Sequence, residues 1–300
     1  MDFFTIRFKT DDAESENRFT KYLHEAISSL HIEQPHIQIS GLADGMVECV
    51  IGLSDIVDLN MRERQIDLLS LGLARYVVDV KEEKLIRRIM SREYRWSSAE
   101  EQEQVAGICR NMLSGSNDYD TSSVKKERIS LIYEALREYL HSSHFIHLEG
   151  FLAFRIKGYE ALLRETIDFA VDEYLLDKQY EEFISLLQYF VYFQEPLTPL
   201  VHLMHKQDHE FAILNEQFTP VNTSSSGVVA RIADQEMEME DVIVSTLISL
   251  SPDRILIHTL DPKAKVIETI RRIFGERVEI CLLCPHCKSF HRQVRHLDQR

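Results

Sequence analysis

Four residues near the carboxyl end of the chain have the types and spacing of a metal site. Cys281, Cys284 and Cys287 are separated from one another by two residues, and His291 follows four positions after the last cysteine. Structural zinc takes four tetrahedral sulfur and nitrogen ligands, and a Cys-Pro-x-Cys turn can aim two thiolates at one ion. The spacing therefore predicts a zinc knuckle with these four residues as ligands.

His258 is an alternative fourth ligand. It is the fourth residue of an apolar segment that begins at Ile255, and Cys281 is the fourth residue of a segment that begins at Val278. If the two segments are adjacent parallel strands in that register, both side chains share one face near the carboxyl ends, where open α/β sheets bind ligands. A hydrogen-bonded histidine within a strand is the competing interpretation.

Two other interpretations of the cysteine cluster stay open. The three thiols could be reduced, partly buried side chains that close a strand without a metal. Cys284 and Cys287 could instead form a redox dithiol, although their motif does not open a helix as it does in thioredoxin. The cluster also matches the start of a ferredoxin-type run, but the fourth cysteine and its proline are missing. An odd total of five cysteines favours metal or thiol chemistry over structural disulfides.

Patterns that indicate catalysis are scarce. Only ten glycines occur in 300 residues, and the sequence has no phosphate-binding glycine loop, nucleophile elbow or H-E-x-x-H motif. Two further histidine sets favour structural roles, one at a helix end and one on a hairpin whose first two histidines face opposite sides. These sets are His141, His144 and His147, and His202, His205 and His209.

We therefore expect a non-catalytic accessory or interaction protein with an unknown protein partner and a candidate zinc ion as its cofactor. The competing hypothesis is a metal-assisted hydrolase or nucleotide-handling enzyme that uses His258 and the cysteine cluster at the carboxyl edge of the last strands.

Charge is divided unevenly along the chain. Residues 263–300 hold nine Lys and Arg against four Asp and Glu, a net charge of +5. Because the whole chain has a net charge of −15, residues 1–262 carry −20. This acidity disfavours nucleic acid as a partner, yet the basic tail keeps nucleic-acid contact open as a second alternative. Five arginines of the tail are candidates for contacting an acidic partner: Arg271, Arg272, Arg292, Arg295 and Arg300.

The sequence predicts a cytoplasmic protein without a membrane segment. Its longest apolar-rich stretch, residues 183–193, is too short to cross a bilayer. The first residues lack the basic start and apolar block of a secretory signal. We expect the aromatic residues of 180–193 to belong to a core rather than to a binding surface.

The elements that position the candidate ligands follow from residue periodicity. The first third predicts a strand, a helix and two strands that are joined at Asp44-Gly45. Helices then predominate, with one over residues 56–94, one over residues 121–140, and two more up to residue 194 with a break near Asp177.

The last hundred residues predict a hairpin, a helix and a parallel β-α-β unit that leads into the cysteines. Asp261-Pro262 is expected to start the helix of that unit, and Gly275 to end it. The chain is thus predicted to be a helix-dominated α+β protein with three regions: an α+β region over 1–95, a helical region over 96–195 and an α/β region over 196–300.

The carboxyl-terminal pattern resembles a known family. Residues 241–258, residues 270–281 and the pair Cys284 and Cys287 are similar to the YtxC-like family, described as sporulation proteins of endospore-forming bacteria. Chain length and the helical stretch 149–157 agree with that resemblance. It implies a cytoplasmic protein in a sporulation programme, and it brings no established catalytic activity, cofactor or site residues.

Overall fold

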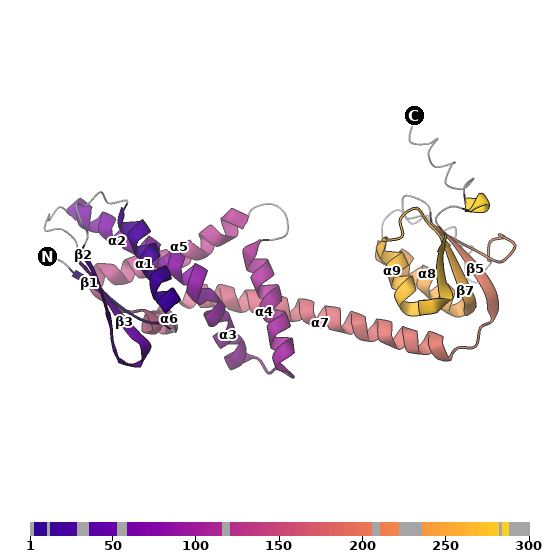
Figure 1. Cartoon of the computed structure of the whole chain (residues 1–300), viewed down its shortest axis with the longest axis horizontal. Coiled ribbons are helices and arrows are strands. Elements are labelled where there is room, and N and C mark those ends of the chain that lie inside the picture. The colour runs from indigo at the N-terminus through magenta and orange to yellow at the C-terminus, as the bar shows by residue number, and fades with distance from the viewer. Residues whose placement is uncertain are drawn as a thin grey trace, which may run out of the picture. The chain divides into compact units, whose positions relative to one another are not determined.

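The computed structural model describes residues 3–10, 13–28, 36–52, 59–115, 121–205, 211–221, 236–281 and 284–287. Within these residues the protein is a helix-dominated α+β fold with two four-stranded sheets, as the sequence predicts (Figure 1). The chain divides into two compact units, Met1–Leu176 and Asp177–Arg300. The finer division at residues 95 and 195 stays a prediction.

The first unit contains a sheet with the strand order β2-β3-β1-β4. Its predicted strands are β1 (Phe3–Lys9), β2 (His36–Gly41) and β3 (Met46–Gly52), which pair antiparallel. Asp44 and Gly45 both have positive φ angles, 60° and 70°, which an Asp-Gly hairpin turn requires. The short strand β4 (Phe145–His147) pairs parallel to β1 and was not expected from the sequence.

Helices account for the rest of the first unit. In chain order these are α1 (Ala13–Ser28), α2 (Leu59–Tyr76), α3 (Glu82–Glu93), α4 (Ala99–Ser114), α5 (Thr121–Ser142) and α6 (Leu148–Phe154). The predicted helix over residues 56–94 is therefore two α-helices, joined through the π-helical segment Val77–Lys81. Buried apolar side chains of β1, β3 and the helices form one continuous core.

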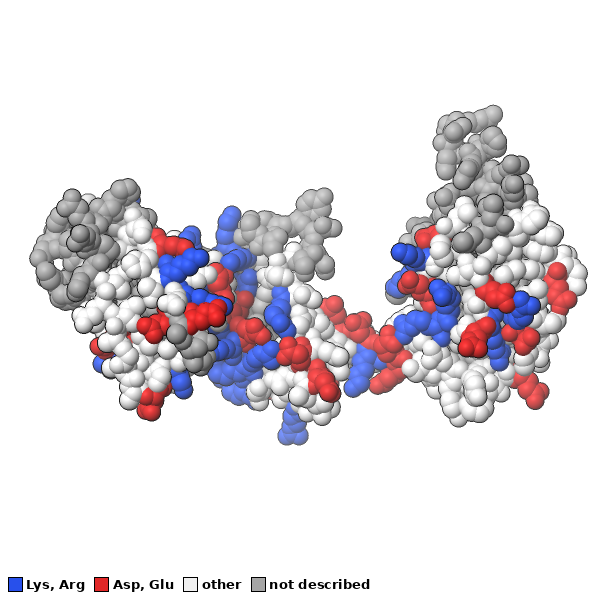
Figure 2. Space-filling model, in the orientation of Figure 1, with Lys and Arg blue, Asp and Glu red and all other residues white. Residues whose placement is uncertain are grey.

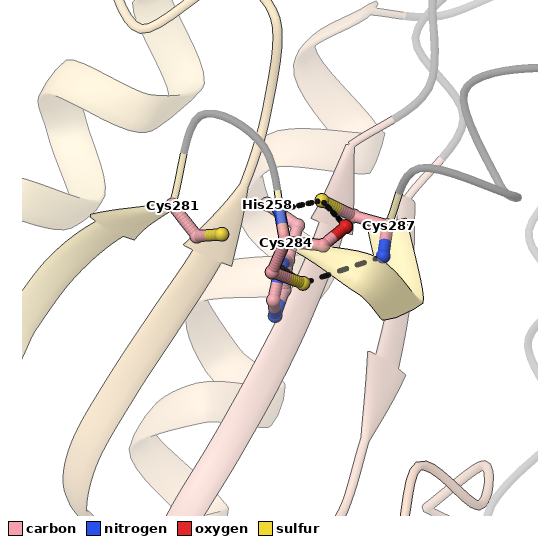
Figure 3. Close-up of side chains that lie close together, drawn as sticks. All are labelled: His258, Cys281, Cys284 and Cys287. Carbon is pink, nitrogen blue, oxygen red and sulfur yellow. Dashed lines mark hydrogen bonds between the residues drawn. The ribbon is translucent and has the colours of Figure 1, made fainter.

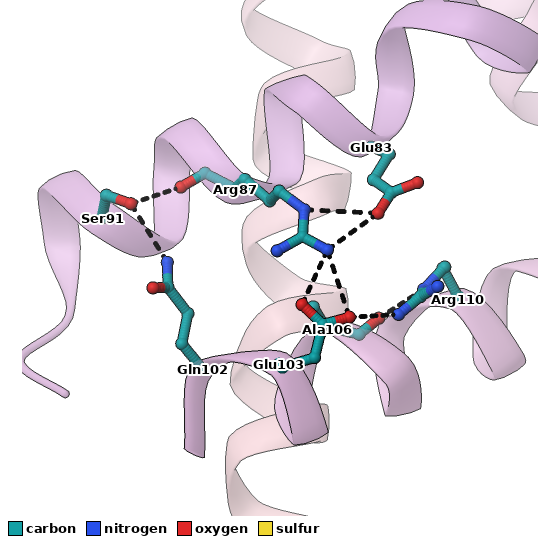
Figure 4. A network of polar contacts seen from close by, with 7 residues as sticks. All are labelled: Glu83, Arg87, Ser91, Gln102, Glu103, Ala106 and Arg110. Carbon is teal, nitrogen blue, oxygen red and sulfur yellow. Dashed lines mark hydrogen bonds and ion pairs between the residues drawn. The ribbon is translucent and has the colours of Figure 1, made fainter. Parts of the chain in front are cut away.

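Polar side chains connect α3 and α4 on the surface. The Arg87 guanidinium donates to Glu83 of its own helix and to Glu103 of α4, and Arg110 donates to Glu103 as well (Figure 4). Gln102 also donates to the hydroxyl of Ser91. Because these groups are exposed, we assign them a small share of the stability.

Helix α7 (Lys157–Phe193) belongs to both units. The break predicted near Asp177 was wrong, because the helix continues without interruption through this position. The local sequence Leu-Leu-Asp-Lys contains neither proline nor glycine, so a charged pair there does not stop the helix. The boundary between the two units nevertheless falls at this position, between Leu176 and Asp177.

The second unit contains a sheet with the strand order β6-β5-β7-β8. Its strands are β5 (Thr198–His205), β6 (Phe211–Leu214), β7 (Pro252–His258) and β8 (Val278–Cys281). β5 and β6 form the predicted hairpin, whereas β5, β7 and β8 run parallel to one another. The second core joins these strands to α7, α8 (Glu236–Leu250) and α9 (Lys265–Phe274).

Helix α9 begins later than the sequence suggests. Its N-cap residue is Ala264, so the expectation that Asp261 caps the helix was wrong. The Asp261 carboxylate instead accepts a hydrogen bond from the backbone N–H of Lys263 at 3.1 Å, which forms a local turn before the helix. Gly275, with a φ of 53°, ends the helix as predicted.

Candidate metal centre

The carboxyl ends of β7 and β8 bring the first two candidate ligands together. These strands are parallel neighbours, and their register pairs His258 with Cys281. This is the register in which the sequence places both side chains on one face. Because the two strands run parallel, both carboxyl ends lie at the same edge of the sheet, where open α/β sheets bind ligands.

The turn after β8 adds the remaining thiols. One ligand atom each from His258, Cys281, Cys284 and Cys287 lies within 4.8 Å of the other three. Figure 3 shows the Cys281 thiol pointing from the end of β8 toward His258 and the turn that carries Cys284 and Cys287. His258 and Cys287 are buried, and the other two cysteines are half-buried.

The separation of the ligand atoms suits a tetrahedral ion. Cys284 Sγ lies 3.6 Å from His258 Nδ1. With Zn–S of about 2.3 Å and Zn–N of about 2.0 Å, tetrahedral zinc would separate a sulfur from a nitrogen by about 3.5 Å. The residues present therefore fit a zinc ion with three sulfur ligands and one nitrogen ligand.

A second histidine orients the His258 ring. His202 of β5 lies on the far side, with its Nδ1 at 3.0 Å from His258 Nε2, and both rings are buried. Burial, together with the nearby His286, lowers the pKa of His202, so its neutral ring can accept a hydrogen bond from His258 Nε2–H. This hydrogen bond leaves His258 Nδ1 without a proton and directed at the sulfurs, as a metal ligand requires.

Aromatic stacking links the knuckle to the turn after β6. The Phe218 ring stacks on His202 at 4.0 Å and on His286 at 4.4 Å. Phe218 has a φ of 58°, a left-handed backbone conformation that is rare for a bulky residue. The Phe218 ring thus contacts both His202, which supports His258, and His286, which lies between Cys284 and Cys287 in the sequence.

Burial and hydrogen bonds shift the pKa values of the three thiols in different directions. Burial raises the pKa of Cys281 to about 11 and also raises that of Cys287. Burial acts in the same direction on Cys284, but hydrogen bonds from the Cys287 backbone N–H and thiol outweigh it and lower the pKa of Cys284. Cys284 is thus the thiol that ionises first, and its thiolate can bind a metal before the others lose their protons.

Several predicted site residues lie elsewhere. His291, Arg292, Arg295 and Arg300 fall outside the described residues. Arg271 and Arg272 are exposed on α9, and Arg272 forms an ion pair with Glu181 of α7. Figure 2 shows Lys and Arg interspersed with Asp and Glu over both units on the face drawn, without a broad basic surface there.

The other histidines divide between local roles and the metal centre. His147 caps α6, because its Nδ1 accepts a hydrogen bond from the Gly150 N–H at 3.2 Å. His205 lies 2.8 Å from the Thr259 hydroxyl, whereas His202 contacts the neighbouring residue His258, so the two side chains lie on opposite faces as predicted. The sequence predicts only a structural role for His202, and its contact with the candidate ligand was not predicted. His209 lies outside the described residues.

The aromatic residues near the end of α7 do not form a core. Ile184 and Val191 are buried in the second core, but the aromatic side chains of this segment are exposed by two fifths or more. The expectation that the whole segment is buried was wrong, because only one face of the helix packs on the second unit. These exposed residues are Tyr180, Phe183, Tyr189, Phe190, Tyr192 and Phe193.

The fold and the site define a helix-dominated α+β protein with a His/Cys group that could hold a metal. The chain belongs to the YtxC-like family, whose family model matches residues 67–279. A relative, the uncharacterised protein YtxC of Bacillus subtilis (strain 168), is 25% identical over 210 residues, which cover 69% of this chain and 74% of that protein. No solved structure matches the chain.

The membership confirms the resemblance of the carboxyl-terminal pattern. Among the helices that the structure describes, none has the length and apolar character needed to cross a bilayer.

Proposed function

We propose that the second unit binds one Zn²⁺ through His258, Cys281, Cys284 and Cys287, and that the ion has a structural role in a non-catalytic interaction protein. The observation that carries the proposal is the convergence of four ligand atoms within 4.8 Å of one another. Three sulfurs and one nitrogen are a ligand set typical of structural zinc.

The ligand set favours structure over catalysis. Catalytic zinc keeps one position for water or substrate, whereas four protein ligands close the coordination sphere. The ion would join the end of β7, the end of β8 and the turn after it, which no disulfide connects. This argues against the metal-assisted hydrolase that the sequence left open, since that mechanism needs an open position.

The proposed setting is the cytoplasm of a sporulating cell. Thiols that serve as zinc ligands persist where the compartment is reducing. The role in sporulation is supported by the family resemblance, and the partner would be a protein. The interspersed charges of Figure 2 favour a protein surface over a phosphate backbone as the partner.

Elemental analysis of protein purified without chelators tests the proposal. We expect about one zinc per chain, and we expect Cys284→Ser and His258→Ala to reduce that content strongly. Cys109→Ser removes a buried cysteine of the first unit and should leave it unchanged.

A matched pair of histidine variants separates the two candidate fourth ligands. His258→Ala should lower the zinc content and affinity, whereas His291→Ala should leave both close to those of the unaltered chain. The opposite result would assign the fourth position to His291. Protein that carries no zinc and gains no stability from added zinc would exclude the centre altogether.

A further inference from the structure

The end of helix α7 carries a second apolar face that the described fold leaves uncovered. Six large side chains over residues 183–193 are each more than half exposed: Phe183, Leu186, Tyr189, Phe190, Tyr192 and Phe193. We call Phe183, Leu186, Phe190 and Phe193 the α7 stripe. A surface helix normally has one apolar face, so a helix that is apolar on two faces is expected to pack on two sides.

The first of these faces is occupied within the second unit. Ile184 and Val191 are buried in its core, and the Gln188 amide donates to the backbone carbonyl of Arg272 on α9. The α7 stripe is offset from this face by roughly a third of a turn, since each residue advances the helix by about 100°. The stripe therefore cannot be explained by contacts of α7 with its own unit.

The spacing of the stripe suits another helix. Its residues follow one another at intervals of three, four and three, the spacing of the a and d positions in a heptad. This order is the same in both directions along the chain. Two copies that run antiparallel would place Phe183 opposite Phe193, and Leu186 opposite Phe190.

The size of the uncovered surface suits a symmetric dimer. If a large side chain offers about 200 Å², the four stripe residues and Tyr189, whose ring contacts Phe193, present about 600 Å² of mainly apolar surface. This is at the upper limit of the largest patch found on a typical monomer. It also supplies most of the ~800 Å² that each partner buries in an interface of standard size.

We propose that two copies of this chain associate through antiparallel packing of their α7 stripes. Charge determines the direction. Residues 172–182 hold five acidic side chains and one lysine, whereas residues 183–194 hold no charged side chain. A parallel pair would set the acidic segments against each other, whereas an antiparallel pair in this register keeps the two acidic segments at opposite ends of the contact.

Sedimentation equilibrium of the 300-residue chain tests the association. The unaltered chain should be dimeric at micromolar concentrations, and the double variant Phe183→Asp, Phe190→Asp should associate at least about 100-fold more weakly. Phe154→Asp changes a phenylalanine of α6 that is 75% exposed, and it should leave the dimer intact. A chain that stays monomeric, or a double variant that dimerises like the unaltered chain, would overturn the proposal.

A photo-crosslinking phenylalanine analogue at position 183 tests the direction and the occupant. The antiparallel dimer predicts crosslinks between copies to residues around Phe193. Crosslinks to position 183 of the second copy would contradict the antiparallel direction. Crosslinks within one chain to the first unit would show that the chain covers its own stripe and would refute the dimer.

Discussion

At the scale of single residues, proton occupancy controls how the candidate centre takes up a metal. The pKa of Cys281 is raised to about 11 and that of Cys287 is raised as well, both chiefly by burial, so neither thiol is ionised near pH 7. Zinc binds thiolates, and it must therefore displace at least these two protons.

We therefore predict that zinc affinity increases with pH. Displacement of two protons changes the apparent affinity by about 100-fold for each pH unit below the thiol pKa values. The affinity should accordingly fall as the pH is lowered from 8 to 6. Competition with a chelator of known affinity would measure the slope, and an affinity that does not change over this range would contradict a site built from protonated thiols.

The contact between His202 and His258 predicts a role in positioning the ligand. His202→Ala removes the acceptor for His258 Nε2–H and should weaken zinc binding by about 10- to 100-fold. His202→Asn keeps a side-chain acceptor near that place and should recover part of the loss. Equal affinities of both variants and the unaltered chain would show that His202 only fills space.

The residues of the centre differ in how far the sequence could predict them. The register of His258 and Cys281 followed from two strand segments of equal length and was confirmed. His202 could not be placed, because its contact depends on β5 lying next to β7, a strand order that no local pattern specifies. Phe218 gave no signal, since its stacking and positive φ arise from the turn after β6.

At the scale of elements, a buried ion pair connects α5 to the start of α3. Arg128 is almost fully buried, pairs with Glu82 through Nη1 and donates from Nη2 to the carbonyl oxygen of Leu113 at 2.8 Å. Tyr159 of α7 donates to the other oxygen of the Glu82 carboxylate. Four segments thus depend on one charge pair.

Removal of the cation should destabilise the first unit. Arg128→Met leaves the Glu82 carboxylate without its cation and should cost about 3 kcal/mol of unfolding free energy. Arg110→Met, at an exposed ion pair, should cost less than about 1 kcal/mol. Denaturant unfolding followed by the fluorescence of Trp96, the single tryptophan, reports on this unit. Equal costs for the two variants would contradict a special role for the buried pair.

Element boundaries followed from periodicity where a stop signal was present. The Asp44-Gly45 turn and the end of α9 at Gly275 were both predicted, because their backbone angles need those residues. The break predicted near Asp177 had no proline or glycine to support it and was wrong. The aromatic end of α7 also misled the prediction, since periodicity shows two apolar faces without showing what covers each.

At the scale of the whole molecule, two separate cores imply two separable responses to metal. The candidate ligands all belong to the second unit, and Trp96 belongs to the first. Removal of zinc with a chelator should therefore lower the melting temperature of the second unit and leave the tryptophan-reported unfolding of the first unchanged. Calorimetry combined with fluorescence would show this, and a joint shift of both transitions would indicate coupled units.

X-ray absorption at the zinc edge is the most direct measurement of the central claim. For the purified 300-residue chain, the proposal predicts three sulfur neighbours at about 2.3 Å and one nitrogen at about 2.0 Å from each zinc ion. In the His258→Ala variant the nitrogen neighbour should be lost or replaced by oxygen. A zinc shell of oxygen and nitrogen alone, or a protein that retains no zinc, would contradict the centre formed by His258, Cys281, Cys284 and Cys287.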